Sequence, residues 1–294
     1  MKTRRKAFLT AIAASAGLVL GADAVSAQQS PPLTKEQIKQ IVASPDRSAA
    51  DRTNDLRRKP EQMLVFIGIR PGINALDLSA AGGYTTELLA RAIGPSGIVY
   101  GQSRPRDPNR APTPPAAAEG NSHPAVPSAA APAATPAAPA GAPRPSPVAL
   151  EERDSALRSA GIKAAPITAV VRPFEDPVPP ELPDFDLVTL MFNYHDLGHL
   201  GVDRAAMNRA VFQALKPGGL YIIADHSGRP GTGISEAGTL HRVEEALVRK
   251  EVEAAGFKLA AEGDFLRNPN DPRDKNTPDP PQPKDEFVLK FVKP

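Results

Sequence analysis

Histidine and aspartate residues recur beyond the ends of several predicted strands in the second half of the chain. They occur in three segments: His195 with Asp196, Asp225 with His226, and His241. In a sheet whose parallel strands alternate with helices, the carboxyl ends of the strands open on one edge, where ligands bind. A carboxylate beside an imidazole fixes its tautomer and raises its basicity. The pattern therefore predicts that the three segments converge and supply a general base near pH 7.

The same side chains suit a metal ion, which is the alternative use of the cluster. His195 and His199 are four positions apart and would share one face of a helix. The residues that could complete such a site are Asp196, Asp225, His226 and His241. Gly198 and the position directly after a strand argue against a regular helix there, so we predict acid–base chemistry and no metal.

Apolar runs and helical periods alternate along most of the chain, which predicts repeated βα units over a mostly parallel sheet. The expected strands cover 73–78, 98–102, 167–171, 185–192, 220–224, 257–261 and 286–292. The expected helices cover 34–42, 61–67, 84–93, 150–159, 203–215 and 236–255. The segment between the last two strands is rich in Pro and Asp, so we expect these strands to pair antiparallel without a helix between them.

One stretch interrupts this alternation. Alanine and proline fill about 27 of the 44 positions from 105 to 148, a composition that cannot bury enough apolar surface to offset its ordering entropy. We therefore expect a disordered insertion at 105–148 in a single α/β domain, whose two halves are 28–104 and 149–294.

The first 27 residues have the pattern of an export signal. Residues 2–6 are basic, an apolar run covers 7–20, and Val25-Ser26-Ala27 provides a small-x-small cleavage site. We expect cleavage near Ala27 and a periplasmic protein; both the general and the twin-arginine export routes remain open. No later apolar run reaches about 18 residues, so we predict no integral membrane association.

Charge and cysteine content narrow the possible functions. The whole chain has 35 Lys and Arg against 33 Asp and Glu, and without residues 1–27 the counts become 31 and 32, a net charge of −1. This balance gives no support to a nucleic-acid partner. The sequence has no cysteine, which excludes disulfides. We expect the partner of the protein to be a small-molecule substrate.

Several short segments together resemble successive motifs of class I S-adenosylmethionine-dependent methyltransferases. They are Arg70-Pro71-Gly72 before Ala75-Leu76-Asp77-Leu78, Gly82-Gly83-Tyr84, Gly94 to Tyr100, Phe185 to Val188 and Leu215 to Gly219. The resemblance extends from about residue 60 to the end and is greatest to an exported subgroup described only as predicted methyltransferases. It implies a Rossmann-like α/β sheet of order 3-2-1-4-5-7-6, with the last strand antiparallel and helices on both faces.

The resemblance also implies S-adenosylmethionine as the cofactor, lying across the carboxyl end of the first strand. The cofactor-binding residues that it implies are Asp77, Ser79, Ala81, Gly82, Gly83, Tyr84, Gln102, Phe174 and Asn193. Ser79 and Ala81 occupy positions where the family has glycine, and Gln102 replaces its ribose-binding acidic residue. Small side chains still let backbone N–H groups approach a ligand.

Three functions follow from these patterns. The first is an exported class I methyltransferase that acts on a small molecule, with His195, His226 or His241 as the base. The alternative is a methyltransferase-like fold that no longer uses S-adenosylmethionine and binds or hydrolyses another small ligand through its His/Asp cluster. The third is an interaction protein that uses the Ala/Pro tract as a tether.

Overall fold

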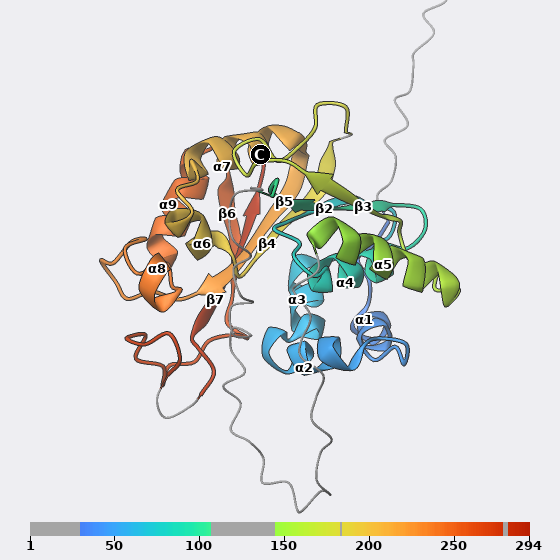
Figure 1. Cartoon of the computed structure of the whole chain (residues 1–294), viewed down its shortest axis with the longest axis horizontal. Helices are drawn as coiled ribbons and strands as arrows, with labels where there is room; N and C mark the ends of the chain where they lie inside the picture. Colours follow the sequence, from blue (N-terminus) through green and yellow to red (C-terminus); the bar gives the residue numbers. More distant parts are fainter. Residues whose placement is uncertain (1–29, 107–144, 183, 279–281) are drawn as a thin grey trace, which may run out of the picture.

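The computed structural model of the chain describes residues 30–106, 145–182, 184–278 and 282–294 (Figure 1). The expected signal segment and most of the Ala/Pro tract lie outside these residues. None of the described helices is long and apolar enough to cross a membrane.

A seven-stranded sheet forms the centre of the fold, and its order is β3-β2-β1-β4-β5-β7-β6. The strands are β1 (Asn74–Leu78), β2 (Ile98–Ser103), β3 (Ile167–Val171), β4 (Phe185–Met191), β5 (Leu215–His226), β6 (Lys258–Gly263) and β7 (Glu286–Val292). The first five strands pair parallel, whereas β7 pairs antiparallel with both β5 and β6. The expected strand order and the antiparallel last strand are therefore confirmed, and the fold is a Rossmann-like methyltransferase fold.

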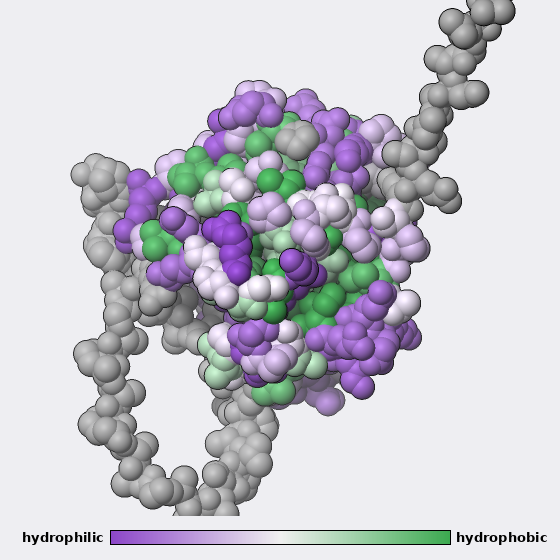
Figure 2. Space-filling view, turned by 90° about the vertical axis from the view of Figure 1, so that its right-hand side faces the viewer, coloured by the Kyte–Doolittle hydropathy of each residue, from purple (hydrophilic) through white to green (hydrophobic). Residues whose placement is uncertain are grey.

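Helices cover both faces of this sheet (Figure 1). One layer contains α1 (Lys35–Val42), α2 (Ala49–Arg58), α3 (Pro60–Ile67), α4 (Tyr84–Ile93) and α5 (Ser146–Ser159). The other contains α6 (Tyr194–His199), α7 (Arg204–Ala214), α8 (Ala237–Leu240) and α9 (Glu245–Ala254). A separate apolar cluster packs each layer against the sheet, as alternate strand side chains point to opposite faces. The side that carries α4 and α5 faces the viewer in Figure 2, which shows a patch of hydrophobic residues surrounded by hydrophilic ones.

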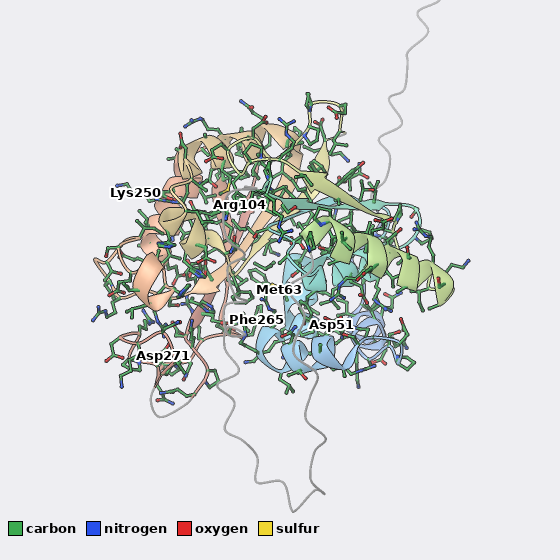
Figure 3. All side chains as sticks on the ribbon, viewed as in Figure 1. Asp51, Met63, Arg104, Lys250, Phe265 and Asp271 are labelled. Carbon is green, nitrogen blue, oxygen red and sulfur yellow. The ribbon has the colours of Figure 1, made fainter. Side chains whose placement is uncertain are left out.

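Polar contacts hold α2, which the apolar pattern did not predict. Its only buried residue is Asp51, which is labelled in Figure 3 and accepts a hydrogen bond from Arg153 of α5 at 2.8 Å. Ser48 caps its first turn. Because ion pairs rather than an apolar stripe position this helix, hydrophobic periodicity gave no signal for it.

Three other expectations are wrong. Gly198 and the position after β4 argued against a regular helix, but α6 covers Tyr194–His199 there. The helix α5 begins at Ser146, so the last three residues of the expected 105–148 insertion are helical; Pro147 is compatible with this because proline is tolerated in a first helical turn. The single helix expected over 236–255 is broken between α8 and α9. His241 has a left-handed backbone there, and Val243 forms a bridge with Ser227 beyond β5.

Candidate functional site

The three histidine segments meet at the carboxyl edge of the sheet. His195 lies on α6 directly after β4, His226 ends β5, and His241 follows α8. The ring centre of His195 is 5.4 Å from that of His226 and 5.6 Å from that of His241. Of the other histidines, His199 is exposed and makes no part of this group, and His123 lies outside the described residues.

A buried carboxylate fixes the His195 ring. The Nδ1 atom of His195 is 2.6 Å from Oδ1 of Asp225, and both side chains are fully buried. Asp225 also accepts hydrogen bonds from the backbone N–H groups of His195 and His226, at 2.8 and 2.7 Å. The partner of His195 Nδ1 is therefore an aspartate from the neighbouring strand, and the ring directs its Nε2 towards Asp196.

Asp196 lies between two imidazoles. Its Oδ1 is 3.3 Å from His195 Nε2 and 3.4 Å from His241 Nδ1, and its Oδ2 accepts a hydrogen bond from Asn193 at 2.9 Å. Burial raises the pKa of the Asp196 carboxyl, but the two imidazoles outweigh this effect and hold the pKa below its usual value. Asp196 is therefore ionised at neutral pH and partly open to solvent.

His226 occupies a more enclosed position. Its Nδ1 is 3.0 Å from Oε1 of Glu286, which also accepts a hydrogen bond from Arg57 at 2.8 Å. Burial lowers the pKa of His226 well below its ordinary value, so the ring is neutral near pH 7. The catalytic role expected for His226 stays a prediction, and its burial favours a role in positioning its neighbours.

The break after α8 explains why His241 reaches the cluster. His241 has φ of 51° and ψ of 54°, a left-handed conformation that is costly for a residue with a Cβ. The next residue, Arg242, is fully buried and pairs with Asp271, which Figure 3 shows in the loop after β6. The Arg242 anchor and the bridge at Val243 turn the chain out of the helix and direct His241 towards α6.

The turn after β1 keeps the backbone of a glycine loop with only part of its glycine content. The φ angles of Ser79, Ala81 and Gly83 are 56°, 47° and 78°. Only Gly83 is a glycine among these three, and a Cβ there would lie 2.8 Å from Leu150 of α5. The two non-glycine residues are held in a conformation that costs about 1–2 kcal/mol each.

Internal hydrogen bonds hold this turn in place, and two of its backbone N–H groups are not used by them. Ser79 donates its N–H to Gln102, Gly83 donates to Ala80, and Arg153 donates to the Gly82 carbonyl. No described residue accepts a hydrogen bond from the N–H of Ala81 or of Gly82, and both residues are exposed. These two N–H groups precede the N-terminus of α4, a position that attracts negative charge.

Two of the residues expected to bind the cofactor are enclosed by the protein. Asp77 is 2% exposed, and its carboxylate accepts hydrogen bonds from Thr86 at 2.6 Å and Thr189 at 2.8 Å. Gln102 is fully buried; its Oε1 accepts from Ser79, and its Nε2 donates to the Arg172 carbonyl at 2.7 Å. Their side chains position the turn, and their direct contact with a cofactor stays a prediction.

The remaining expected cofactor residues also make internal contacts. Tyr84 donates its hydroxyl to Asp55 at 2.7 Å, and Phe174 is 5% exposed within the apolar cluster beneath α7 and α9. Asn193 is half-buried beside Asp196. Asn193 and the turn at Ser79 to Gly82 are thus the predicted cofactor positions that remain open at the sheet edge.

Sequence reasoning missed Arg58. It stacks on the rings of Phe192 and Tyr84, and it makes no hydrogen bond or ion pair with any other described residue. Burial and the neighbouring Arg57 lower the pKa of Arg58 to about 10. Arg58 and Met63, which is labelled in Figure 3, line a small, largely apolar hollow between α3 and α4. Two consecutive arginines at the end of a polar helix were the only sequence signal.

Comparison with known proteins gives partial structural likeness. No family model matches the chain, and no curated protein matches its sequence. Among solved structures, a SAM-dependent methyltransferase from Aquifex aeolicus is 15% identical, with a TM-score of 0.48, and the match covers 89% of this chain and 100% of that one.

Two more solved structures are similar at the same level. A TehB-like SAM-dependent methyltransferase from Corynebacterium glutamicum is 14% identical, with a TM-score of 0.45 and coverage of 83% and 96% of the two chains. An S-adenosylmethionine-dependent methyltransferase from Clostridium acetobutylicum is 12% identical, with a TM-score of 0.43 and coverage of 87% and 96%. The TM-scores are below 0.5, so the three structures are only loosely similar to this chain. The fold assignment depends on the strand order and directions given above.

Proposed function

We propose that this chain is a methyltransferase that binds S-adenosylmethionine over the turn after β1 and methylates a small molecule at the His/Asp cluster. The observation that carries this proposal is the turn itself. Ser79 and Ala81 are held at positive φ, and the N–H groups of Ala81 and Gly82 have no acceptor among the described residues. Backbone strain retained at an exposed turn is characteristic of a ligand-binding site.

The cofactor would be held mainly by backbone groups. The exposed N–H groups of Ala81 and Gly82 suit a carboxylate or a hydroxyl oxygen of the cofactor, and Ser79 and Asn193 are half-exposed at the same edge. Gln102 is uncharged, and its amide already forms hydrogen bonds with Ser79 and Arg172, so the ribose would have no charged partner at the end of β2. We therefore expect weaker binding than a carboxylate at that position would give.

The His/Asp cluster would hold the methyl acceptor. Methyl transfer is an in-line displacement at a sulfonium carbon, so the protein must align the acceptor and remove a proton from its O, N or S atom. Asp196 and His241 are partly exposed, whereas His195 behind them is fixed by Asp225. Two partly exposed side chains could therefore position an acceptor, and the buried, oriented imidazole of His195 could take its proton.

A second candidate function is binding or hydrolysis of a different small ligand on the same fold. The full engagement of Gln102 and Asp77 inside the protein favours it, since the side chains that the resemblance assigns to the cofactor are unavailable. The predicted export favours it too, because S-adenosylmethionine is made in the cytosol. A folded protein exported with its cofactor bound could complete one turnover.

Calorimetric titration separates the two candidates. Residues 28–294, treated with a chelator, would be titrated with S-adenosylmethionine and with S-adenosylhomocysteine. We expect micromolar binding of both. Gly82→Trp should weaken it at least tenfold, because a Cβ at Gly82 meets no atom within 4 Å and the indole would cover the turn. Ala205→Trp, on an exposed position of α7, is the matched control. If the folded protein gives no heat with either S-adenosyl compound, the methyltransferase proposal is refuted and the second candidate is left.

Export is also a proposal of ours, resting on residues 1–27 of the sequence. Fractionation of a Gram-negative host that expresses the whole chain, with the mass of the mature product, would test it. We expect a periplasmic protein that starts at Gln28. Recovery of the full-length chain in the cytosol would refute both the cleavage site and the periplasmic location.

A further inference from the structure

Three side chains at the sheet edge present donor atoms towards one another: His195 Nε2, Asp196 Oδ1 and His241 Nδ1. Each is of a type that binds divalent transition metals, and all three atoms lie within 4.8 Å of one another. The geometry points to a zinc site formed by His195, Asp196 and His241, oriented by Asp225 and Asn193. This site goes beyond the proposed methyl transfer and depends on that proposal only for its place in a reaction.

Two of the three distances between donor atoms match tetrahedral zinc. Ligands about 2.0–2.1 Å from a tetrahedral ion are about 3.3–3.4 Å from one another. The carboxylate oxygen of Asp196 is 3.3 Å from His195 Nε2 and 3.4 Å from His241 Nδ1. The two imidazole nitrogens lie within 4.8 Å of each other, so an ion between the three residues requires them to approach by at most about 1.5 Å.

The atoms that would not touch the ion are held by other groups. Nδ1 of His195 faces Asp225 at 2.6 Å, the carboxylate–histidine arrangement that fixes a metal-binding imidazole with its other nitrogen towards the ion. Oδ2 of Asp196 accepts a hydrogen bond from Asn193, which leaves Oδ1 directed towards the two imidazoles. Two of the three ligands thus have the outer partners that protein zinc sites use.

The backbone supports the same assignment. His241 keeps a left-handed conformation, and the buried Arg242 and the bridge at Val243 hold it there. A strained residue that packing over-determines is characteristic of functional sites. The strain places the His241 ring 5.6 Å from the His195 ring instead of on a continuous helix.

The cluster borders solvent through two of its three side chains. The side chain of His195 is fully buried, whereas those of Asp196 and His241 are 28% and 31% exposed. Three protein ligands leave the fourth position of a tetrahedral ion to water or substrate, as in catalytic rather than structural zinc sites. Water or an acceptor hydroxyl could occupy that fourth position, where the ion would lower its pKa. This would deepen the proposed function, because the cluster would act on its ligand through the metal.

Zinc binding can be measured in the absence of S-adenosylmethionine and S-adenosylhomocysteine. A tag-free chain of residues 28–294 would be dialysed against a chelator and then titrated with Zn²⁺ in competition with a chromophoric chelator. We expect one zinc per chain. Asp196→Asn and His241→Ala should each weaken zinc binding at least 100-fold. His199→Ala, which removes an exposed imidazole from the same helix, should change it by less than threefold.

Two further measurements make the result decisive. Co²⁺ bound to the wild-type chain should show the visible absorption typical of tetrahedral coordination, and that absorption should be lost in His241→Ala. Circular dichroism would establish that each variant is folded. Failure of the folded wild-type chain to bind zinc, or binding that survives both ligand substitutions, would overturn the site. Titration of the metal-free chain with S-adenosylmethionine and S-adenosylhomocysteine tests the proposed function separately. A failure of the zinc site can therefore be distinguished from a failure of the proposed function.

Discussion

Replacing Asp77 by Asn tests whether the carboxylate at the end of β1 is an internal group. Asp77 is 2% exposed, and its carboxylate accepts hydrogen bonds from the hydroxyls of Thr86 and Thr189. Burial raises the pKa of Asp77 to about 6, although both hydroxyls and the charge of Arg58 act in the opposite direction. An asparagine has the shape of the protonated acid, and a threonine hydroxyl can accept as well as donate.

The pH dependence follows from these values. The folded chain binds the Asp77 proton more tightly than the unfolded chain, whose pKa is near 3.8. This group therefore stabilises the fold most below pH 3.8, and the contribution is lost as the pH rises through about 6. A difference of about 2 pH units corresponds to about 3 kcal/mol. About 2 kcal/mol of this loss lies between pH 4.5 and 7.5.

Urea unfolding followed by circular dichroism would measure the effect. We expect Asp77→Asn to gain about 2 kcal/mol on the wild-type chain between pH 4.5 and 7.5, whatever the offset between them at pH 4.5. Thr189→Val removes a hydrogen bond to the carboxylate and should move the wild-type loss of stability to higher pH. A constant difference between Asp77→Asn and the wild type at all pH values would refute the enclosed carboxylate. Because Asp77 is enclosed, we also expect S-adenosylhomocysteine affinity to change by less than about threefold.

Three more outcomes follow from the fold. Ala81→Gly should stabilise the chain by about 0.5–1 kcal/mol in urea unfolding, because relief of a positive φ outweighs the added freedom of the unfolded chain; Ala205→Gly on α7 should instead destabilise it. Arg242→Met should cost about 3–5 kcal/mol, since it leaves Asp271 buried without its partner. Replacing 107–144 by a short Gly/Ser linker should shift the melting temperature by less than about 3 °C, and a larger loss would show that this tract packs on the domain.

The order of the sheet could be predicted because local signals and motif order agree. Short β-branched runs alternate with helical periods, which predicts a mostly parallel sheet, and the resemblance to class I methyltransferases implies the strand order with its antiparallel end. The helix α2 could not be found in this way. Its sequence, AADRTNDLRR, has no apolar face, and the contacts of Asp51 with Arg153 depend on α5, about 100 positions later.

Membership of the candidate site was easier to predict than its pairing. The sequence places His195 beside Asp196 and Asp225 beside His226, and residues at the ends of neighbouring parallel strands must lie close together. The closest pairs cross between segments: His195 with Asp225 at 2.6 Å, and His226 with Glu286 of β7 at 3.0 Å. The neighbouring Asp196 faces His195 at the longer distance of 3.3 Å.

The register between β4 and β5 decides this crossing. Met191 lies opposite Ala224, and Phe192 donates its N–H to the Ala224 carbonyl at 2.7 Å. The chain after Phe192 therefore begins α6 level with Asp225, whose carboxylate accepts the N–H of His195 as well as facing its ring. A shift of one residue between the two strands would bring Ala224 or His226 in place of Asp225 to this position and separate His195 from its carboxylate. The site is thus a property of how two strands align, which explains why the residue types could be read from the sequence and the pairing could not.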